Sequence, residues 1–341
     1  LSALGRHDAA LGHYQVLARR PGHEFVGRRL EAGAMVAAGD TLGARSVVER
    51  AMVAGQADGA TYLLCGELSL KLGDAAGAAR CLDTALAKEP DNAAARAMLG
   101  ESFIRLGATE KGLAELDAAA AANPADPAPL RRAGRLLEGM GRHREALERY
   151  AKILGTAPRD TEALIATANV HLALGELDQA RTIAISLVGT PVQESMGQYV
   201  IGRIALVQRQ NEEAVLALAR ATRLDPRHGA AWAALGDAYL ALNDGAKARE
   251  ALDKAAALPG VDSGVLRRLA ELESRAGRHA PALAALERAI ALEPADAELR
   301  LAQARTLAAL TRWHESGNAA REAQRLLPKS VEPLLLAADA A

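Results

Sequence analysis

Three histidines with the same local sequence are the residues whose type and spacing first suggest chemistry. His7, His143 and His279 each follow a Gly-Arg pair, and successive members are 136 residues apart. Histidine is a common zinc ligand, so recurring histidines could indicate a metal site. Such regular spacing instead predicts equivalent, exposed positions at the starts of distant helices, which cannot share one coordination sphere. We therefore expect no metal and no other cofactor.

The chain contains none of the short motifs that commonly position catalytic groups. A P-loop, a GxGxxG dinucleotide loop, an HExxH zinc motif and a GxSxG nucleophile turn are all absent from the sequence. The net charge of −1 argues against a nucleic-acid partner, which requires many basic residues on one face. Apolar runs such as residues 118–122 are too short to span a membrane. The sequence predicts a binding protein with no catalytic residue and no integral membrane segment.

Arginine supplies most of the positive charge. Only 7 of the 41 Lys and Arg residues are lysine. A GC-rich bacterial genome would explain this bias and is the simpler explanation. The alternative is a surface that binds carboxylates or phosphates, which the guanidinium group holds in a bidentate manner.

A fixed period of 34 residues organises the elements that must position these side chains. Nine full repeats begin at Phe25, Gly59, Ala93, Pro127, Thr161, Ser195, Gly229, Ser263 and Ala297. Position 8 is always Gly or Ala and position 20 always Gly, Ala or Ser, which indicates two closely packed helices in each unit. Glycine at position 15 of six units favours the turn that ends the first helix, and a proline recurring at position 32 follows the second. Each unit is predicted to be a helix, a turn and a second helix.

The two ends of the chain contain partial repeats. Residues 1–24 match the second helix of a unit, and residues 331–341 match the start of a tenth unit. We expect one solenoid over residues 1–341, because each repeat of such a fold packs only on its neighbours. Neither end shows a polar capping helix, which indicates a piece of a longer array whose apolar ends could self-associate.

The 34-residue period resembles the tetratricopeptide repeat. A good local match consists of Trp232, Leu235, Gly236, Tyr239, Ala248, Leu252 and Ala255. The resemblance implies an all-α fold, a right-handed superhelical solenoid of stacked helix–turn–helix units. It also implies that the first helices line a concave groove that binds a protein or peptide partner.

The resemblance places a set of mostly basic side chains in that groove. They are Arg131, Arg132 and Arg135 in repeat four, Tyr199 and Arg203 in repeat six, and Arg267, Arg268 and Arg275 in repeat eight. One interpretation is that the two arginine clusters clamp an anionic segment, either an acidic peptide or an acidic polysaccharide. The other is that they pair with Glu138, Glu271 and other local carboxylates as an ordinary solvated surface.

Short segments resemble the long repeat arrays of bacterial exopolysaccharide export. They are residues 99–101 and 112–116, and the similar arrays include the periplasmic cellulose-export subunit and the repeat lipoprotein of PEP-CTERM (exosortase) sorting. The resemblance implies a scaffold in a bacterial multi-component assembly, with the periplasm slightly favoured over the cytoplasm. Two alternatives stay open: a regulatory or targeting region of a larger glycosyl- or sulfotransferase, and direct binding of an anionic polysaccharide.

Repeat five departs from the regular pattern. Its position 24 is Ala184, its position 27 is Leu187, and its proline, Pro191, comes one place early. A shifted proline and added bulk should alter how neighbouring units pack. The sequence predicts a local change of curvature near residues 183–197.

Both cysteines of the chain belong to repeat two. Cys65 lies at position 7 and Cys81 at position 23, one on each predicted helix. Small cysteines are common in buried cores, and the interpretation we favour is that both are ordinary core residues without a disulfide. A disulfide within the repeat is the alternative, because the two helices are expected to pack together.

Overall fold

The computed structural model describes residues 7–20, 22–55 and 57–328. These residues form 19 α-helices and contain no strand, which confirms the all-α prediction. The chain divides into two compact units, Leu1–Ala163 and Leu164–Ala341, and the division falls within α10 (Thr161–Ala173). The predicted start of a tenth repeat, at residues 331–341, lies outside the described residues.

Unit 1 contains nine helices in its described part before α10. They are α1 (His7–Leu17), α2 (Glu24–Ala37), α3 (Thr41–Val53), α4 (Gly59–Lys71), α5 (Ala75–Lys88), α6 (Ala93–Arg105), α7 (Thr109–Ala122), α8 (Ala128–Gly139) and α9 (His143–Thr156). Unit 2 continues after α10 with α11 (Leu177–Ser186), α12 (Pro191–Val207), α13 (Asn211–Leu224), α14 (Gly229–Ala241), α15 (Gly245–Ala257), α16 (Ser263–Arg275), α17 (His279–Leu292), α18 (Ala297–Ala309) and α19 (Trp313–Leu326).

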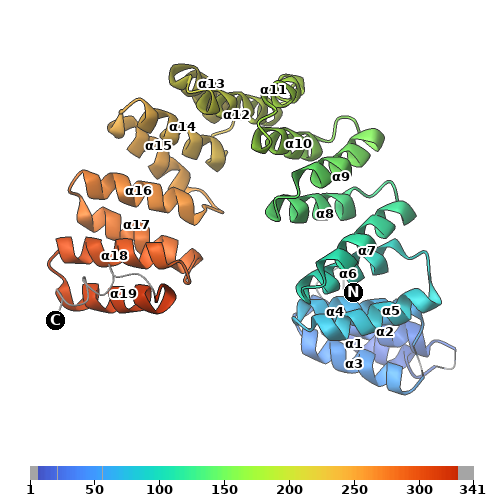
Figure 1. Cartoon of the computed structure of the whole chain (residues 1–341). Coiled ribbons are helices and arrows are strands. Elements are labelled where there is room, and N and C mark those ends of the chain that lie inside the picture. Colours follow the sequence, from blue (N-terminus) through green and yellow to red (C-terminus); the bar gives the residue numbers. More distant parts are fainter. Residues whose placement is uncertain (1–6, 21, 56, 329–341) are drawn as a thin grey trace. The chain divides into compact units, whose positions relative to one another are not determined.

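Within each unit the helices pack in chain order, as Figure 1 shows. The first helix of a repeat contacts its own second helix, as α4 contacts α5 and α12 contacts α13. First helices also contact the first helix of the next repeat, as α4 contacts α6 and α12 contacts α14. We call the surface formed by these helices the first-helix face: α2, α4, α6 and α8 in unit 1, and α12, α14, α16 and α18 in unit 2.

The core of each repeat depends on a match between a small residue at position 8 and a larger one at position 24. A Cβ atom added to Gly236 would lie 2.7 Å from Cγ of Leu252, and one added to Gly100 would lie 2.9 Å from the carbonyl oxygen of Gly112. Glycine at position 8 accompanies Leu or Tyr at position 24 in all five repeats that have it. Alanine at position 8 accompanies Val or Ala, with one exception, Ala270 with Leu286. The pairs therefore hold roughly constant volume, as close packing demands.

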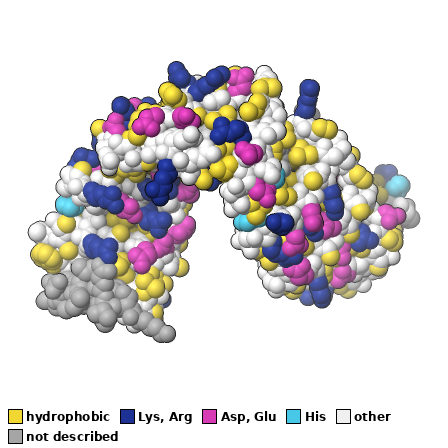
Figure 2. Space-filling view, turned by 45° about the horizontal axis from the view of Figure 1, so that its top comes forward, with side chains coloured by type: hydrophobic (Ala, Val, Ile, Leu, Met, Phe, Trp, Pro, Cys, Tyr) yellow, Lys and Arg dark blue, Asp and Glu magenta, His cyan; other side chains and the backbone are white. Residues whose placement is uncertain are grey.

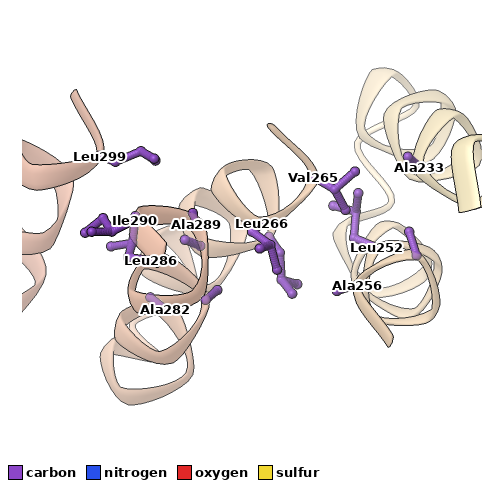
Figure 3. Close-up of a cluster of buried hydrophobic side chains, with 14 residues drawn as sticks. Ala233, Leu252, Ala256, Val265, Leu266, Ala282, Leu286, Ala289, Ile290 and Leu299 are labelled. Carbon is purple, nitrogen blue, oxygen red and sulfur yellow. The ribbon is translucent and has the colours of Figure 1, made fainter. Parts of the chain in front are cut away.

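Neighbouring repeats then share their cores. Figure 3 shows this for α15 to α18, where Leu252 of one repeat lies beside Val265 of the next. Further along the same cluster, Leu286 and Ile290 of α17 are joined by Leu299 of α18. Each helix pair thus buries its apolar side against the adjoining pairs.

Position 15 has a left-handed backbone in every repeat. The six glycines at this position have φ between 72° and 89°. Arg209, Asn243 and Thr311 occupy the same position in repeats six, seven and nine, each with φ of 59°. The packing of the two helices therefore imposes this conformation even where the residue disfavours it. Thr311 is the most strained of the three, because it is β-branched.

Thr311→Gly is expected to raise the free energy of unfolding by about 1 kcal/mol. Relief of about 1–2 kcal/mol of left-handed strain should exceed the roughly 0.5–1 kcal/mol that glycine costs through unfolded-chain entropy. Urea unfolding followed by circular dichroism would measure the change. Asn243→Gly is the matched control and should be nearly neutral, because Asn tolerates this conformation. A larger gain at Asn243 than at Thr311 would contradict the explanation.

The irregularity predicted in repeat five is present in the helix lengths. The second helix α11 has only 10 residues, and the following α12 has 17 and begins at Pro191. Thr190 caps α12 through a reciprocal arrangement with Gln193, which fixes where the helix starts. The early proline thus shortens the connection and extends the next first helix. The predicted change of curvature stays a prediction.

Cys65 and Cys81 form a disulfide between α4 and α5. The favoured reading of two free core cysteines was therefore wrong, although both residues are buried as expected. The 5.9 Å between their Cα atoms lies within the range for disulfides. Positions 7 and 23 of one repeat face each other across the helix pair, which the repeat register alone could have indicated.

Candidate functional site

The arginines of repeat four are held by carboxylates from α10 and the turn before it. Arg131 donates a hydrogen bond to Asp160 over 2.8 Å, and its Nε lies 3.0 Å from an oxygen of Glu162. Arg135 also pairs with Glu162. Both guanidinium groups on α8 are therefore neutralised within unit 1.

Arg132, also on α8, pairs with a carboxylate that precedes it in the sequence. Its Nη2 lies 2.9 Å from a carboxylate oxygen of Glu101 on α6, which also pairs with Arg105. The predicted partner Glu138 instead accepts a hydrogen bond from the hydroxyl of Tyr150. The arginines of repeat four therefore pair with nearby carboxylates, as one interpretation expected. The partners are Asp160, Glu162 and Glu101 and not Glu138.

Repeats six and eight in unit 2 show a different arrangement. Arg203 lies over the ring of Tyr199, with 5.8 Å between the guanidinium carbon and the ring centroid. Arg268 pairs with Asp237 of α14 over 3.0 Å. Within residues 7–20, 22–55 and 57–328, Arg267 and Arg275 form no ion pair. Both are exposed, so their positive charges are available to a ligand.

These two arginines border a cavity of about 220 Å³ between α16 and α18. Its base is apolar and consists of Ala270, Leu286 and Ala302. Its other lining residues are Arg267, Glu271, Ser274 and Arg275 of α16, with Arg305 and Thr306 of α18. The cavity lies on the first-helix face and combines an apolar base with a basic rim.

A buried polar cluster links the first helix of repeat six with the turn that precedes α14. Ser195 is fully buried at the start of repeat six, and its hydroxyl donates to the carbonyl oxygen of Ala221 over 2.9 Å. Since that hydrogen is used, Ser195 Oγ accepts from Nδ1 of His228, also at 2.9 Å. The ring of Tyr199 covers His228 with 5.0 Å between centroids. Burial lowers the pKa of His228, and the nearby Asp225 only partly opposes this shift.

Acidification is expected to weaken the contact between Ser195 and His228. The pKa of His228 is lower in the folded protein than in the unfolded chain, where it is about 6.5. The stability that neutral His228 contributes is therefore fully present above the unfolded pKa and is lost as pH falls through the folded pKa. Urea unfolding at several pH values between about 5 and 8 would measure it, with His228→Asn as control. Asparagine occupies this repeat position at Asn92, cannot titrate there and can donate to Ser195. Equal pH dependence of the two proteins would contradict the assignment.

Sequence reasoning identified Arg267, Glu271 and Arg275 but missed the rest of the cavity and the buried cluster. Arg305 occupies position 9 of repeat nine, the position of Arg135 in repeat four and Arg203 in repeat six, so the repeat register could have found it. The unusual pair of Ala270 and Leu286 marks the base of the cavity in the sequence. No comparable signal marked the contact of Ser195 with His228, which lie 33 residues apart at the two ends of repeat six.

The described residues offer little other chemistry. No cluster of His, Cys, Asp and Glu suited to a metal ion occurs in the part of the chain that the structure describes. Among those same residues, every helix is too short or too polar to cross a bilayer. Figure 2 shows basic and acidic side chains interspersed on the visible face. Such mixing is typical of a surface without a single-sign field.

Comparison with known proteins identifies the repeats directly. One tetratricopeptide repeat model matches residues 66–127 and 199–262, and a second matches residues 137–198, together more than half of the chain. No curated protein sequence is significantly similar to this chain.

Solved structures with similar folds include other repeat proteins. A tetratricopeptide repeat protein from Parabacteroides merdae is 16% identical, with a TM-score of 0.57, over 73% of this chain and 98% of that one. A protein of the same kind from Thermus thermophilus is 30% identical, with a TM-score of 0.45, over 55% of this chain and 100% of that one. The first shares the fold of stacked helix pairs. From the family models and this fold, the chain belongs to the tetratricopeptide repeat family.

Proposed function

We propose that this chain is a non-catalytic scaffold that binds a protein partner on its first-helix face within a multi-component assembly. The first helix α4 contacts α2 and α6, and α12 contacts α14, so an extended segment can lie across neighbouring repeats. The observation that carries the proposal is the cavity between α16 and α18, which has an apolar base and two arginines free of ion pairs in the described part of the chain. Such a combination suits recognition rather than covalent chemistry.

The site comprises the first-helix side chains that the sequence singled out. They are Arg131, Arg132, Arg135, Tyr199, Arg203, Arg267, Arg268 and Arg275. In this proposal the paired arginines of α8 shape and orient the face, whereas Arg267 and Arg275 of α16 supply most of the charge that binds the ligand. Charges already matched locally add little affinity, because the ligand must replace an existing partner.

We further propose that the assembly is a bacterial one for exopolysaccharide export. The similarity of residues 99–101 and 112–116 to such arrays supports this. The Cys65–Cys81 disulfide adds support, because disulfides persist in oxidising compartments such as the periplasm. Deleting the gene and measuring secreted polysaccharide tests the assembly: a loss restored by the wild-type gene supports it, and unchanged secretion contradicts it.

Site-directed photo-crosslinking tests the scaffold function itself. A photoreactive phenylalanine analogue would replace Arg135 of α8 or Glu271 of α16, both exposed on first helices. Leu42 of α3 and Leu216 of α13, exposed on second helices, are the matched controls. In the native host, we expect one protein to crosslink from the first-helix positions only, and to bind the purified chain in solution. Equal crosslinking from both sets, or none, would contradict the proposal.

A further inference from the structure

We infer that the cavity between α16 and α18 recognises an acidic residue followed by an apolar one in an extended segment of the partner protein. The inference rests on the proposed scaffold function and specifies the ligand of one of its sites. An aspartate or glutamate carboxylate would lie between Arg267 and Arg275, and the neighbouring apolar side chain would enter the cavity. The lining, the charges and the contrast with repeat four support this choice.

The base of the cavity accepts an apolar side chain. It is formed by Ala270, Leu286 and Ala302, and the cavity of about 220 Å³ is large enough for one aliphatic group. The hydroxyl of Thr306 already donates to the carbonyl oxygen of Ala302 over 2.8 Å, so it does not add a free donor there. An apolar group that leaves water for this base is stabilised by the hydrophobic effect.

The rim carries excess positive charge. Arg267 and Arg275 border the cavity without an ion pair in the described part of the chain, and Glu271 is the one carboxylate among its lining residues. Arg29 and Arg131, at the position equivalent to Arg267, pair with Asp58 and Asp160. The corresponding Asp296 caps α18, as Asp58 caps α4, but does not pair with Arg267 in the described part of the chain. The guanidinium group of Arg267 therefore borders the cavity rather than a local carboxylate.

The same chemistry is not available on α8. Arg131 and Arg135 share Glu162, and Arg132 is bound to Glu101. A ligand carboxylate there would have to displace these residues and leave their charges without partners. The two arginine clusters, equivalent in the sequence, are therefore expected to differ in affinity for anions.

The apolar base favours a peptide over a polysaccharide. Sugar rings usually stack on aromatic side chains, and no aromatic residue lines this cavity. A peptide can present a carboxylate and an aliphatic side chain on adjacent residues, and the guanidinium group binds carboxylate in a bidentate manner. The ligand class is thus an acidic, apolar peptide segment.

Fluorescence anisotropy with the full chain tests the inference. The probe is a fluorescein-labelled, amidated peptide with an alternating Glu-Leu-Glu-Leu core. Two matched peptides replace every Glu by Gln or every Leu by Ser. We expect the parent peptide to bind at least about tenfold more tightly than either matched peptide. The Gln peptide loses charged hydrogen bonds to arginine, and the Ser peptide loses the burial of an apolar side chain. No detectable binding of the parent peptide would overturn the inference.

Variants of the chain locate the binding. Arg267→Gln with Arg275→Gln should weaken binding of the parent peptide by at least about tenfold. Arg220→Gln with Arg223→Gln, both exposed on the second helix α13, is the matched control and should change it by less than about twofold. Equal losses in both variants would overturn the inference. Competition by polygalacturonate at low salt would overturn it in favour of a polysaccharide.

The two proposals can fail separately. If first-helix crosslinks to the partner persist in the Arg267→Gln, Arg275→Gln variant, the cavity does not recognise that partner, and the scaffold function stands. If wild-type protein gives no selective crosslinks, the scaffold function fails, whatever the peptide binds. Circular dichroism of the variants should match wild type, because both arginines are exposed and form no ion pair among the described residues.

Discussion

Reducing the Cys65–Cys81 disulfide is expected to lower the free energy of unfolding of the α4–α5 pair by about 3 kcal/mol. The bond closes a loop with a sequence separation of 16, and opening it returns conformational entropy to the unfolded chain. The effect should be local, because each repeat of a solenoid contacts only its neighbours. The two cysteines also belong to a buried cluster with Val47 and Leu68, so the helices stay packed when the bond opens.

Hydrogen exchange read by mass spectrometry would measure this loss repeat by repeat. With a phosphine reductant, peptides from α4 and α5 should exchange faster, whereas peptides from α16 and α17 should not change. The Cys65→Ala, Cys81→Ala variant is the control and should not respond to reductant. A uniform response along the chain would show that the bond does not act locally. A response in the variant would show that the reductant acts on something other than the bond.

The helical plan was predictable because it depends on one repeated interaction. Small residues at positions 8 and 20 and glycine at position 15 indicated every helix pair. Arg209 and Thr311 show the limit of reasoning from residue type. Neither residue type favours a left-handed backbone, yet both adopt it, because the packing of the two helices fixes the conformation of the connecting turn. Register along the chain was therefore more informative than local propensity.

The chemistry of the site was predictable only in part, because side-chain pairing crosses between repeats. The 34-residue register makes Arg131 and Arg267 equivalent, both at position 5 of their repeats. It could not show that Arg131 pairs with Asp160, 29 residues away, whereas Arg267 forms no such pair among the described residues. That difference depends on how adjacent helices stack. The base of the cavity depends equally on packing, since Leu286 belongs to the second helix.

Tyr150→Ala is expected to destabilise unit 1 by about 3–5 kcal/mol, the range for truncating a buried aromatic residue. Tyr150 is fully buried and takes the place of the leucine found at this position in five other repeats. Its hydroxyl donates to Glu138, and burial raises its pKa, so it stays protonated and keeps this bond. Urea unfolding would measure the loss. Tyr150→Phe removes only the hydroxyl and should cost about 1 kcal/mol. Similar losses for both variants would place the stabilisation in the hydroxyl and not in the ring.

A double-mutant cycle with Gly134 would test why the ring is accommodated at all. A Cβ atom on Gly134 would lie 2.5 Å from Cε1 of Tyr150, so Gly134→Ala should cost roughly 1–3 kcal/mol with the tyrosine present. In the Tyr150→Val background the cost should nearly vanish, because the chain itself uses this pair as Ala32 with Val48. The expected coupling therefore exceeds the roughly 0.5 kcal/mol within which independent substitutions add. Additive effects would mean that the volume match between positions 8 and 24 is not what holds the helix pair together.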